Sequence, residues 1–239
     1  VNGNDTWWYV TGSKVNFCNT VASNACGWWK ITNGRVDFDF SGLAENAYGW
    51  LKITNGQVDF SYVGYEQNGS NWWYVYGGQV CFQATDVLPG TVGGQYGWWK
   101  VCEGKVNFDD DVCENAYGWW KITTGKVDFQ YMGLAQNACG WWMIQNGHVN
   151  FGSNGLVDNG NGWWLVKNGG VDFNYNGLVD NGNGWWLIRN GYVDFNYNGL
   201  VDNGNGWWLV KNGCVDFSYQ GYVQNECGVW WVSNGQVQF

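Results

Sequence analysis

The sequence has 239 residues, of which 45% are hydrophobic and 20% aromatic, and its formal net charge is −9. Helix formers are scarce beside Trp, Tyr, Phe, Val and Gly, which excludes a helical bundle and favours an all-β fold. The negative charge excludes a nucleic-acid-binding face, and no apolar run approaches the roughly 18 residues of a transmembrane helix.

An internal repeat of about 22 residues fills the chain. The dipeptide Trp-Trp, or a close variant, begins at residues 7, 28, 50, 72, 98, 119, 141, 163, 185 and 207, and an eleventh copy has Val229 in place of the first Trp. A fixed period of this length is typical of solenoid architectures. We expect one continuous solenoid, with repeats 1–4 at residues 1–84, an inserted loop at 85–97 that holds the only proline, and repeats 5–11 at 98–239.

Each repeat predicts a β-hairpin, which is described here by positions counted from the first Trp as position 0. Asn-Gly stands at +5 and +6 in seven copies, for example Asn33-Gly34. Because a type I′ turn needs positive φ at two residues, Asn-Gly between apolar runs is a strong hairpin signal. In that register +3 faces +8 and +1 faces +10, so we expect Trp at +1, Val or Ile at +3, Val at +8 and Phe at +10 to form the core. The opposite face should be solvated, with Lys at +2 paired with Asp at +9, as in Lys30 and Asp37.

One such hairpin is too small to fold alone, because ordering about 22 residues costs roughly 20–40 kcal/mol and four buried side chains return about 6–12 kcal/mol. Stability must come from packing between neighbouring repeats. The predicted fold is an all-β superhelix, a β-hairpin repeat solenoid of about 11 repeats.

The first Trp of each pair is the main candidate for ligand binding, because this register leaves it off the core face. Indole rings suit sugar rings and quaternary ammonium groups. The alternative is that these rings pack between adjacent repeats. The candidates are Trp7, Trp28, Trp50, Trp72, Trp98, Trp119, Trp141, Trp163, Trp185 and Trp207.

Tyrosine at +12 is the natural second wall of such a site, because a phenol combines an apolar ring with a polar tip. The alternative is a spacer whose hydroxyl satisfies loop backbone. These tyrosines are Tyr62, Tyr131, Tyr175, Tyr197 and Tyr219.

The remaining polar residues predict no catalytic site, no metal site and no cofactor. The string DNGNG, which first appears at 158–162, offers one Asp per copy, and turn chemistry explains its Asn and Gly without calcium. The only histidine, His148, lies beside a turn and is interpreted as exposed and inert. No nucleophile elbow or metal motif is present.

The eight cysteines do not follow the repeat. An even number suits disulfides and an oxidising, extracellular compartment, and the absence of an initiator Met agrees with a removed signal peptide. Spacing suggests one set of pairs among 105 connectivities, namely Cys18–Cys26, Cys81–Cys102, Cys113–Cys139 and Cys214–Cys227.

The repeat resembles the cell-wall-binding repeats of secreted Gram-positive proteins, the family that includes choline-binding and glucan-binding modules. The resemblance is carried by strings such as GWWKITNGRVDFDFSGLAENA (27–47) and GWWLVKNGGVDFNYNGLVDNGN (162–183). It implies a superhelix of hairpins that holds ligands between aromatic side chains of consecutive repeats. Where the choline-binding pattern has Gly-Trp, this chain has Gly followed by Leu or Tyr, as at Leu43 and Tyr65, which leaves choline and a glycan as alternative ligands.

Two hypotheses for function follow. The first is a secreted or cell-surface, non-catalytic module that binds a cell-wall polymer or glycan through repeated aromatic sites, with avidity from many weak contacts. The second is a secreted surface protein or adhesin that binds a host protein such as an immunoglobulin or mucosal receptor. Neither hypothesis requires nucleic acid or a transmembrane segment.

Overall fold

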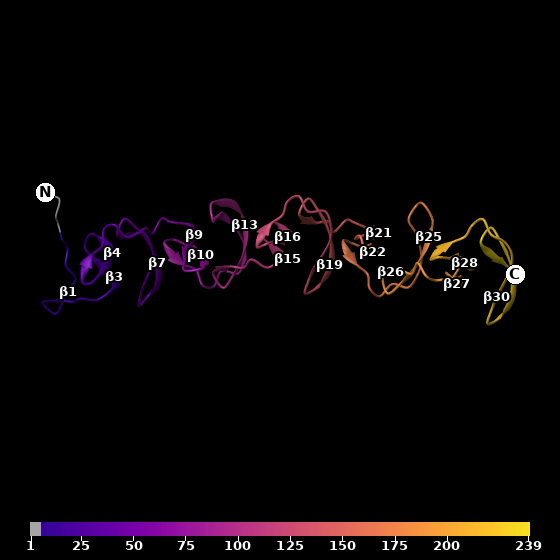
Figure 1. Cartoon of the computed structure of the whole chain (residues 1–239), viewed down its shortest axis with the longest axis horizontal. Coiled ribbons are helices and arrows are strands. Elements are labelled where there is room, and N and C mark those ends of the chain that lie inside the picture. Colours follow the sequence, from indigo (N-terminus) through magenta and orange to yellow (C-terminus); the bar gives the residue numbers. More distant parts are fainter. Residues whose placement is uncertain (1–5) are drawn as a thin grey trace. The chain divides into compact units, whose positions relative to one another are not determined.

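The structure is a computed structural model that describes residues 6–239, and every regular element in this part of the chain is a β-strand. No helix within the described residues is long and apolar enough to cross a membrane. The first repeat contributes a two-stranded ribbon, and each of the ten later repeats contributes three antiparallel strands. Figure 1 labels at least one strand of every repeat. The predicted all-β architecture of repeated hairpins is therefore confirmed.

The chain divides into two compact units, and the first comprises residues 1–117 and 122–127. Its strands are β1 (Val10–Thr11), β2 (Lys14–Val15), β3 (Thr20–Asn24), β4 (Gly27–Thr32), β5 (Arg35–Val36), β6 (Gly42–Asn46), β7 (Gly49–Thr54), β8 (Gln57–Val58), β9 (Gly64–Asn68), β10 (Asn71–Tyr76), β11 (Gln79–Val80), β12 (Asp86–Val92), β13 (Gln95–Cys102), β14 (Lys105–Val106), β15 (Asp111–Asn115), the end of β16 (Gly118–Thr123) and β17 (Lys126–Val127).

The second unit comprises residues 118–121 and 128–239. It holds the start of β16 and the strands β18 (Gly133–Asn137), β19 (Gly140–Gln145), β20 (His148–Val149), β21 (Gly155–Asp158), β22 (Trp163–Lys167), β23 (Gly170–Val171), β24 (Gly177–Asp180), β25 (Trp185–Arg189), β26 (Tyr192–Val193), β27 (Gly199–Asp202), β28 (Trp207–Lys211), β29 (Cys214–Val215), β30 (Gln220–Asn225), β31 (Gly228–Ser233) and β32 (Gln236–Gln238).

The Asn-Gly turns lie where the sequence predicts them. In the repeat at Trp28, Ile31 pairs with Val36 and Thr32 pairs with Arg35, so +3 faces +8 and +4 faces +7. Asn33 and Gly34 have φ values of 48° and 75°, the positive pair that a type I′ turn requires. The hairpin register is therefore correct.

A longer hairpin precedes each of these turns, and the repeat pattern did not predict it. Strand β3 runs antiparallel to β4 from Thr20–Ile31 to Asn24–Gly27, so the Trp-Trp strand is the central strand of three. The same arrangement occupies the segment 85–97, which was expected to be a loop. There β12 pairs with β13 from Asp86–Val101 to Val92–Gln95, because Gly93 and Gly94, both at positive φ, close a two-residue turn.

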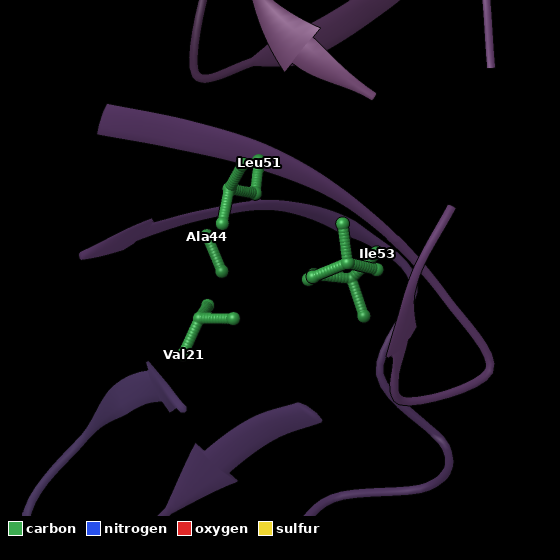
Figure 2. Close-up of a cluster of buried hydrophobic side chains, with 5 residues drawn as sticks. Val21, Ala44, Leu51 and Ile53 are labelled. Atoms are coloured by element: carbon green, nitrogen blue, oxygen red, sulfur yellow. The ribbon is translucent and has the colours of Figure 1, made fainter. Parts of the chain in front are cut away.

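The core lies between repeats and not within one hairpin. In one cluster the +2 residue Leu165 packs against Ile188 and Val193, the +3 and +8 residues of the next repeat. An equivalent cluster joins Val21 to Ala44, Leu51 and Ile53 of the following repeat (Figure 2). Each repeat therefore buries one face against the opposite face of its neighbour, which is how hairpins too small to fold alone gain stability.

This stacking corrects the prediction of a solvated opposite face. Leu165 at +2 is buried, and even Lys52 at +2 is only 9% exposed. The backbone sets Asp59 opposite Lys52 as predicted, since the Asp59 N–H donates to the Lys52 carbonyl over 2.9 Å, but the Lys52 ammonium pairs with Glu66 of the next repeat at 2.7 Å. The sequence pattern defined the two faces correctly, but the next repeat covers the second face.

Backbone hydrogen bonds join each turn to the preceding repeat. The Gly191 N–H donates to the Tyr175 carbonyl over 3.0 Å, and the Asn190 N–H donates to the Asn176 side chain over 3.0 Å. A polar residue at +13 therefore accepts a hydrogen bond from a backbone N–H in the turn of the next repeat, which would otherwise lack a partner.

Candidate ligand-binding site

Most first tryptophans pack between repeats and do not form an exposed row. Trp7, for example, contacts Trp29 with ring centroids 5.1 Å apart and Phe38 at 5.7 Å. Its neighbours in the array, from position 28 to position 207, are half-buried as well. The same contact of a first Trp with the second Trp of the next repeat occurs in the pairs Trp50–Trp73, Trp119–Trp142, Trp141–Trp164, Trp163–Trp186 and Trp185–Trp208.

The second Trp and the Phe at +10 belong to the same aromatic clusters, which contradicts the prediction that Phe is core. Phe60 is 54% exposed and Phe217 is 43% exposed, whereas Val58 and Val215 two residues earlier are buried. The Phe rings lie edge-to-face on the second Trp of their own repeat, as Phe217 does on Trp208 at 5.7 Å. The neighbouring repeat covers the valine but not the end of its strand. Most second tryptophans, such as Trp8, Trp29 and Trp73, are accordingly half-buried or exposed, and Trp99 is buried.

Among the described residues, Trp7, Trp28, Trp163 and Trp207 each line a cavity, and the cavities at Trp28 and Trp207 expose mainly aromatic and apolar walls. One pocket of about 160 Å³ is lined by Trp28, Tyr48, Leu51, Phe60 and Gln79, and we name it the Trp28 cup. Here Leu51 replaces the second Trp, so the ring that fills most interfaces is missing, and Trp28 instead meets Tyr48 at 5.8 Å.

The second cavity, named the Trp207 cup, has a volume of about 240 Å³ and an almost equivalent lining from the last two repeats. Its walls are Leu200, Trp207, Asn225, Cys227, Trp230, Val237 and Phe239. Both cups combine the first Trp of one repeat with the −2, +1 and +10 residues of the next. Their aromatic and apolar walls suit a compact apolar cation, which is attracted by the negative face of indole rings.

The tyrosines at +12 lie beside the interfaces with their hydroxyls occupied. Tyr175 Oη donates to the Leu178 carbonyl over 3.1 Å, and Tyr62 Oη donates to the Tyr65 carbonyl over 2.8 Å. Burial, followed by the negative charge of Glu66, raises the pKa of Tyr62. Equivalent bonds fix Tyr131, Tyr197 and Tyr219. The geometry matches the spacer interpretation for this position.

In three repeats the aspartate at +9 pairs with the cation at +4 of its own repeat, as Asp172, Asp194 and Asp216 do. Lys167 Nζ lies 2.9 Å from Asp172 Oδ2 and 4.2 Å from the centre of the Tyr175 ring. The hydrogen bond from Lys167 lowers the pKa of the half-buried Asp172. In the same repeat the DNGNG loop uses its oxygens for turns, since the Asp158 carboxylate accepts the Gly160 N–H over 2.8 Å. Within residues 6–239 no group of three or more metal-ligating side chains converges.

His148 is half-buried and packs edge-to-face on Trp120 at 4.9 Å, so the expectation of an exposed histidine is corrected. The register places position +7 of one repeat against +1 of the preceding repeat, here His148 against Trp120. Sequence spacing within a repeat does not reveal such a neighbour.

All eight cysteines are free thiols in the structure. Cys227 lines the Trp207 cup, whereas Cys214 lies against Gly184 and pairs in register with Trp186, so their predicted bond finds no support in the geometry. Cys102 and Cys113 line one small pocket although spacing assigned them to different pairs. The four predicted disulfides remain predictions.

Four buried indole N–H groups have no hydrogen-bond partner, those of Trp73, Trp164, Trp186 and Trp208. In another repeat the Trp142 indole N–H donates to Asn137 over 3.0 Å. In the DNGNG loop before Trp163 the residue equivalent to Asn137 is Asn159, and its side-chain oxygen accepts the Asn161 N–H instead of an indole N–H. Beside these loops lies a polar pocket of about 500 Å³, lined by Asn154, Gly155, Leu156, Asp158, Trp163, Asp180, Asn181 and Asn183.

Comparison with known proteins identifies a repeat family that matches parts of this chain. The family model for the choline-binding repeat matches residues 1–16, 61–81, 152–172, 174–194 and 196–216. The chain therefore contains repeats of the choline-binding type in these five segments. The resemblance drawn from the Trp-Trp, Asn-Gly and Val-Asp-Phe pattern is thereby confirmed.

Solved structures that are similar to this repeat protein share little sequence with it. Choline binding protein F from Streptococcus pneumoniae is 17% identical over 87% of this chain and 76% of its own, with a TM-score of 0.34. A complex of CbpF with ipratropium gives 17% identity over the same shares, with a TM-score of 0.35. Alternansucrase in complex with isomaltononaose is 11% identical over 92% of this chain and 16% of its own, with a TM-score of 0.31. None of the curated proteins matches the sequence significantly.

The departure from Gly-Trp has a structural role in this choline-binding-type array. In three repeats the residue concerned, at −7 from the next Trp-Trp strand, packs into the interface between repeats: Leu134 and Leu200 are buried and Tyr65 is 4% exposed, whereas Tyr222 in the last repeat is 71% exposed. The aromatic wall that the family pattern places there is supplied in the cups by the +1, +10 and −2 residues of the next repeat.

Proposed function

We propose that this protein is a non-catalytic, surface-associated binding module whose Trp28 and Trp207 cups each hold a quaternary ammonium group of the cell envelope, with choline as the simplest ligand. The observation that carries the proposal is the pair of aromatic cavities, about 160 and 240 Å³, at equivalent positions in two interfaces between repeats. In most other interfaces the first Trp is in contact with the second Trp of the next repeat. Desolvated contacts between a cation and an aromatic ring contribute about 2 kcal/mol, so each cup should bind weakly.

The electrostatics agree with a cationic ligand. The net charge of −9 attracts cations over a longer range, and both cups offer few groups that could bond the many hydroxyls of a sugar. Single sites in the millimolar range would still retain a polymer through multivalency.

The test is a titration followed at the tryptophan indole N–H resonances by NMR. Millimolar choline should shift resonances of the two cups, and the uncharged isostere with carbon in place of the ammonium nitrogen should shift them far less. Trp207→Leu should remove one set of shifts, whereas the matched variant Trp185→Leu, at a filled interface, should leave both sets. Absence of any shift with choline would refute the proposal.

A glycan is the second candidate ligand, because the polar pocket beside Trp163 combines an indole with carboxylates and amides. An indole face with surrounding hydrogen-bonding groups is the chemistry that holds sugar rings. Binding to polysaccharide fractions that is lost in Asn183→Ala and kept in Trp207→Leu would favour this ligand over choline. The host-protein hypothesis predicts instead one stoichiometric protein partner in a pulldown from serum or mucosal secretions.

A further inference from the structure

Lys100, Cys102, Asp111 and Cys113 form a polar cluster in the otherwise apolar interface after the β12–β13 hairpin. Lys100 and Cys102 lie on β13 on either side of the buried Val101, so they share the face that Val101 does not. On β15, Asp111 and Cys113 likewise flank the buried Val112.

The two faces meet. Lys100 Nζ lies 2.7 Å from Asp111 Oδ2, which fixes β13 against β15 at this point. Lys100, Cys102 and Cys113 also line one pocket of about 100 Å³, so both thiols border the same small space. Cys102 lies two residues from Lys100, and Cys113 lies two residues from Asp111, so each cysteine is close along its strand to the Lys100–Asp111 ion pair. Because the two cysteines also share one small cavity, they are arranged for cross-linking.

We propose that Cys102 and Cys113 form a disulfide when the protein meets a disulfide oxidant. The Cys102 thiolate attacks a sulfur of the oxidant, releasing one thiolate and leaving a mixed disulfide. Cys113 then loses its proton to solvent and attacks the Cys102 sulfur, which releases the second thiol of the oxidant. The two cysteines lose two electrons, and the oxidant gains them as it is reduced to two thiols.

The surroundings of Cys113 make its attack the slow step. Burial, with the charge of Asp111 and a hydrogen bond to that carboxylate, raises the pKa of Cys113 to about 12, although Lys100 opposes the shift. Because the thiolate is the nucleophile, ring closure should accelerate tenfold for each pH unit between 7 and 9. Asp111→Asn removes the negative charge that disfavours the Cys113 thiolate, so it should accelerate closure of the disulfide at a fixed pH.

The cluster contrasts with the partner that spacing suggested for Cys102. The Cys81 N–H donates to the Tyr74 carbonyl of its own repeat over 3.0 Å, and Cys81 does not line the pocket that Cys102 and Cys113 share. The structure therefore points to Cys113 and not to Cys81.

The experiment treats the folded chain with oxidised glutathione, blocks free thiols with N-ethylmaleimide, and digests with trypsin without reduction. The sequence gives a decisive readout, because Cys102 falls on the tryptic peptide 101–105 and Cys113 on 106–121. Mass spectrometry should find these two peptides joined, both in the wild-type chain and in the matched control Cys81→Ser. In Cys113→Ser, peptide 101–105 should instead carry glutathione.

Other linkages would overturn the proposal. A Cys81–Cys102 bond would join peptide 53–100 to 101–105, and a Cys113–Cys139 bond would join 106–121 to 127–167. If N-ethylmaleimide still modified both Cys102 and Cys113 after prolonged treatment with oxidised glutathione, both thiols would have stayed free and the proposal would be refuted as well.

Discussion

At the scale of single residues, the glycine at +6 is the most constrained position of the repeat. Gly191 has a φ of 76°, and a Cβ placed on it would lie 2.5 Å from the Asp172 carbonyl of the preceding repeat. No side chain fits at that distance unless the backbone of the neighbouring repeat moves. The turn that sets the register inside one repeat therefore also sets the distance between two repeats.

Gly191→Ala should destabilise the chain by more than the cost of left-handed backbone alone, which is about 1–2 kcal/mol. The matched control is Gly182→Ala, with a φ of 85° and open space around the added methyl. Thermal unfolding followed by circular dichroism should show a larger fall in midpoint for Gly191→Ala, at roughly 2–4 °C per kcal/mol. Equal falls for the two variants would show that contact with the preceding repeat does not matter.

A second residue-scale prediction concerns Asp111. Burial raises the pKa of Asp111, but hydrogen bonds from Lys100 and the Val112 N–H outweigh it, so the net pKa is lowered. A carboxyl whose folded pKa lies below its unfolded value stabilises the fold fully above about pH 4, and this contribution is lost as pH falls through the folded pKa. Wild type should therefore exceed Asp111→Asn in unfolding midpoint at pH 7 and converge with it below pH 4.

The background variant Lys100→Gln provides the control for this effect. If the ion pair is the cause, Asp111→Asn should cost much less stability in that background than in the wild-type chain, as a double-mutant cycle measures. A gap between wild type and Asp111→Asn that persists undiminished to pH 2 would contradict the assignment.

At the scale of the element, the side chain at +1 helps to determine how an interface is filled. Trp29, Trp73 and Trp208 each meet the first Trp of the preceding repeat with centroids 4.9–5.2 Å apart. Where Leu51 occupies this position, the Trp28 cup remains. The Trp28 cup thus arises at a local departure from the repeat, whereas the Trp207 cup keeps Trp230 at +1 and lies before the repeat that has Val229 in place of its first Trp.

Leu51→Trp should close the Trp28 cup. The added indole would occupy the cavity as its equivalents do elsewhere, so the choline-induced shift of the Trp28 indole resonance should vanish while that of Trp207 persists. Leu51→Met, similar in volume to leucine, is the matched control and should retain both shifts. Retention of the Trp28 shift in Leu51→Trp would place the ligand somewhere other than the cup.

At the scale of the whole molecule, the sequence predicted what local chemistry decides and missed what a neighbour decides. Positive φ at Asn33-Gly34 follows from the two residues alone, so the hairpins and their register were predictable. The exposure of Phe60 and the burial of Leu165 depend on which surface the next repeat covers. The cups were missed because the sequence shows Leu51 and Val229 as departures from Trp-Trp but does not show which residues of the next repeat meet the first Trp.

The presence of two cups in one chain predicts avidity for a polymer. A polymer that bears choline at intervals can engage both cups, so its affinity should exceed that for free choline by up to about 10²–10⁴-fold. Trp207→Leu or Leu51→Trp alone should leave the dissociation constant for free choline nearly unchanged while removing most of this gain. Surface plasmon resonance on sparsely and densely choline-coated surfaces measures both quantities. If either variant retained the full gain on the dense surface, two cups would be too few to explain polymer binding, and the filled interfaces would have to open to ligand.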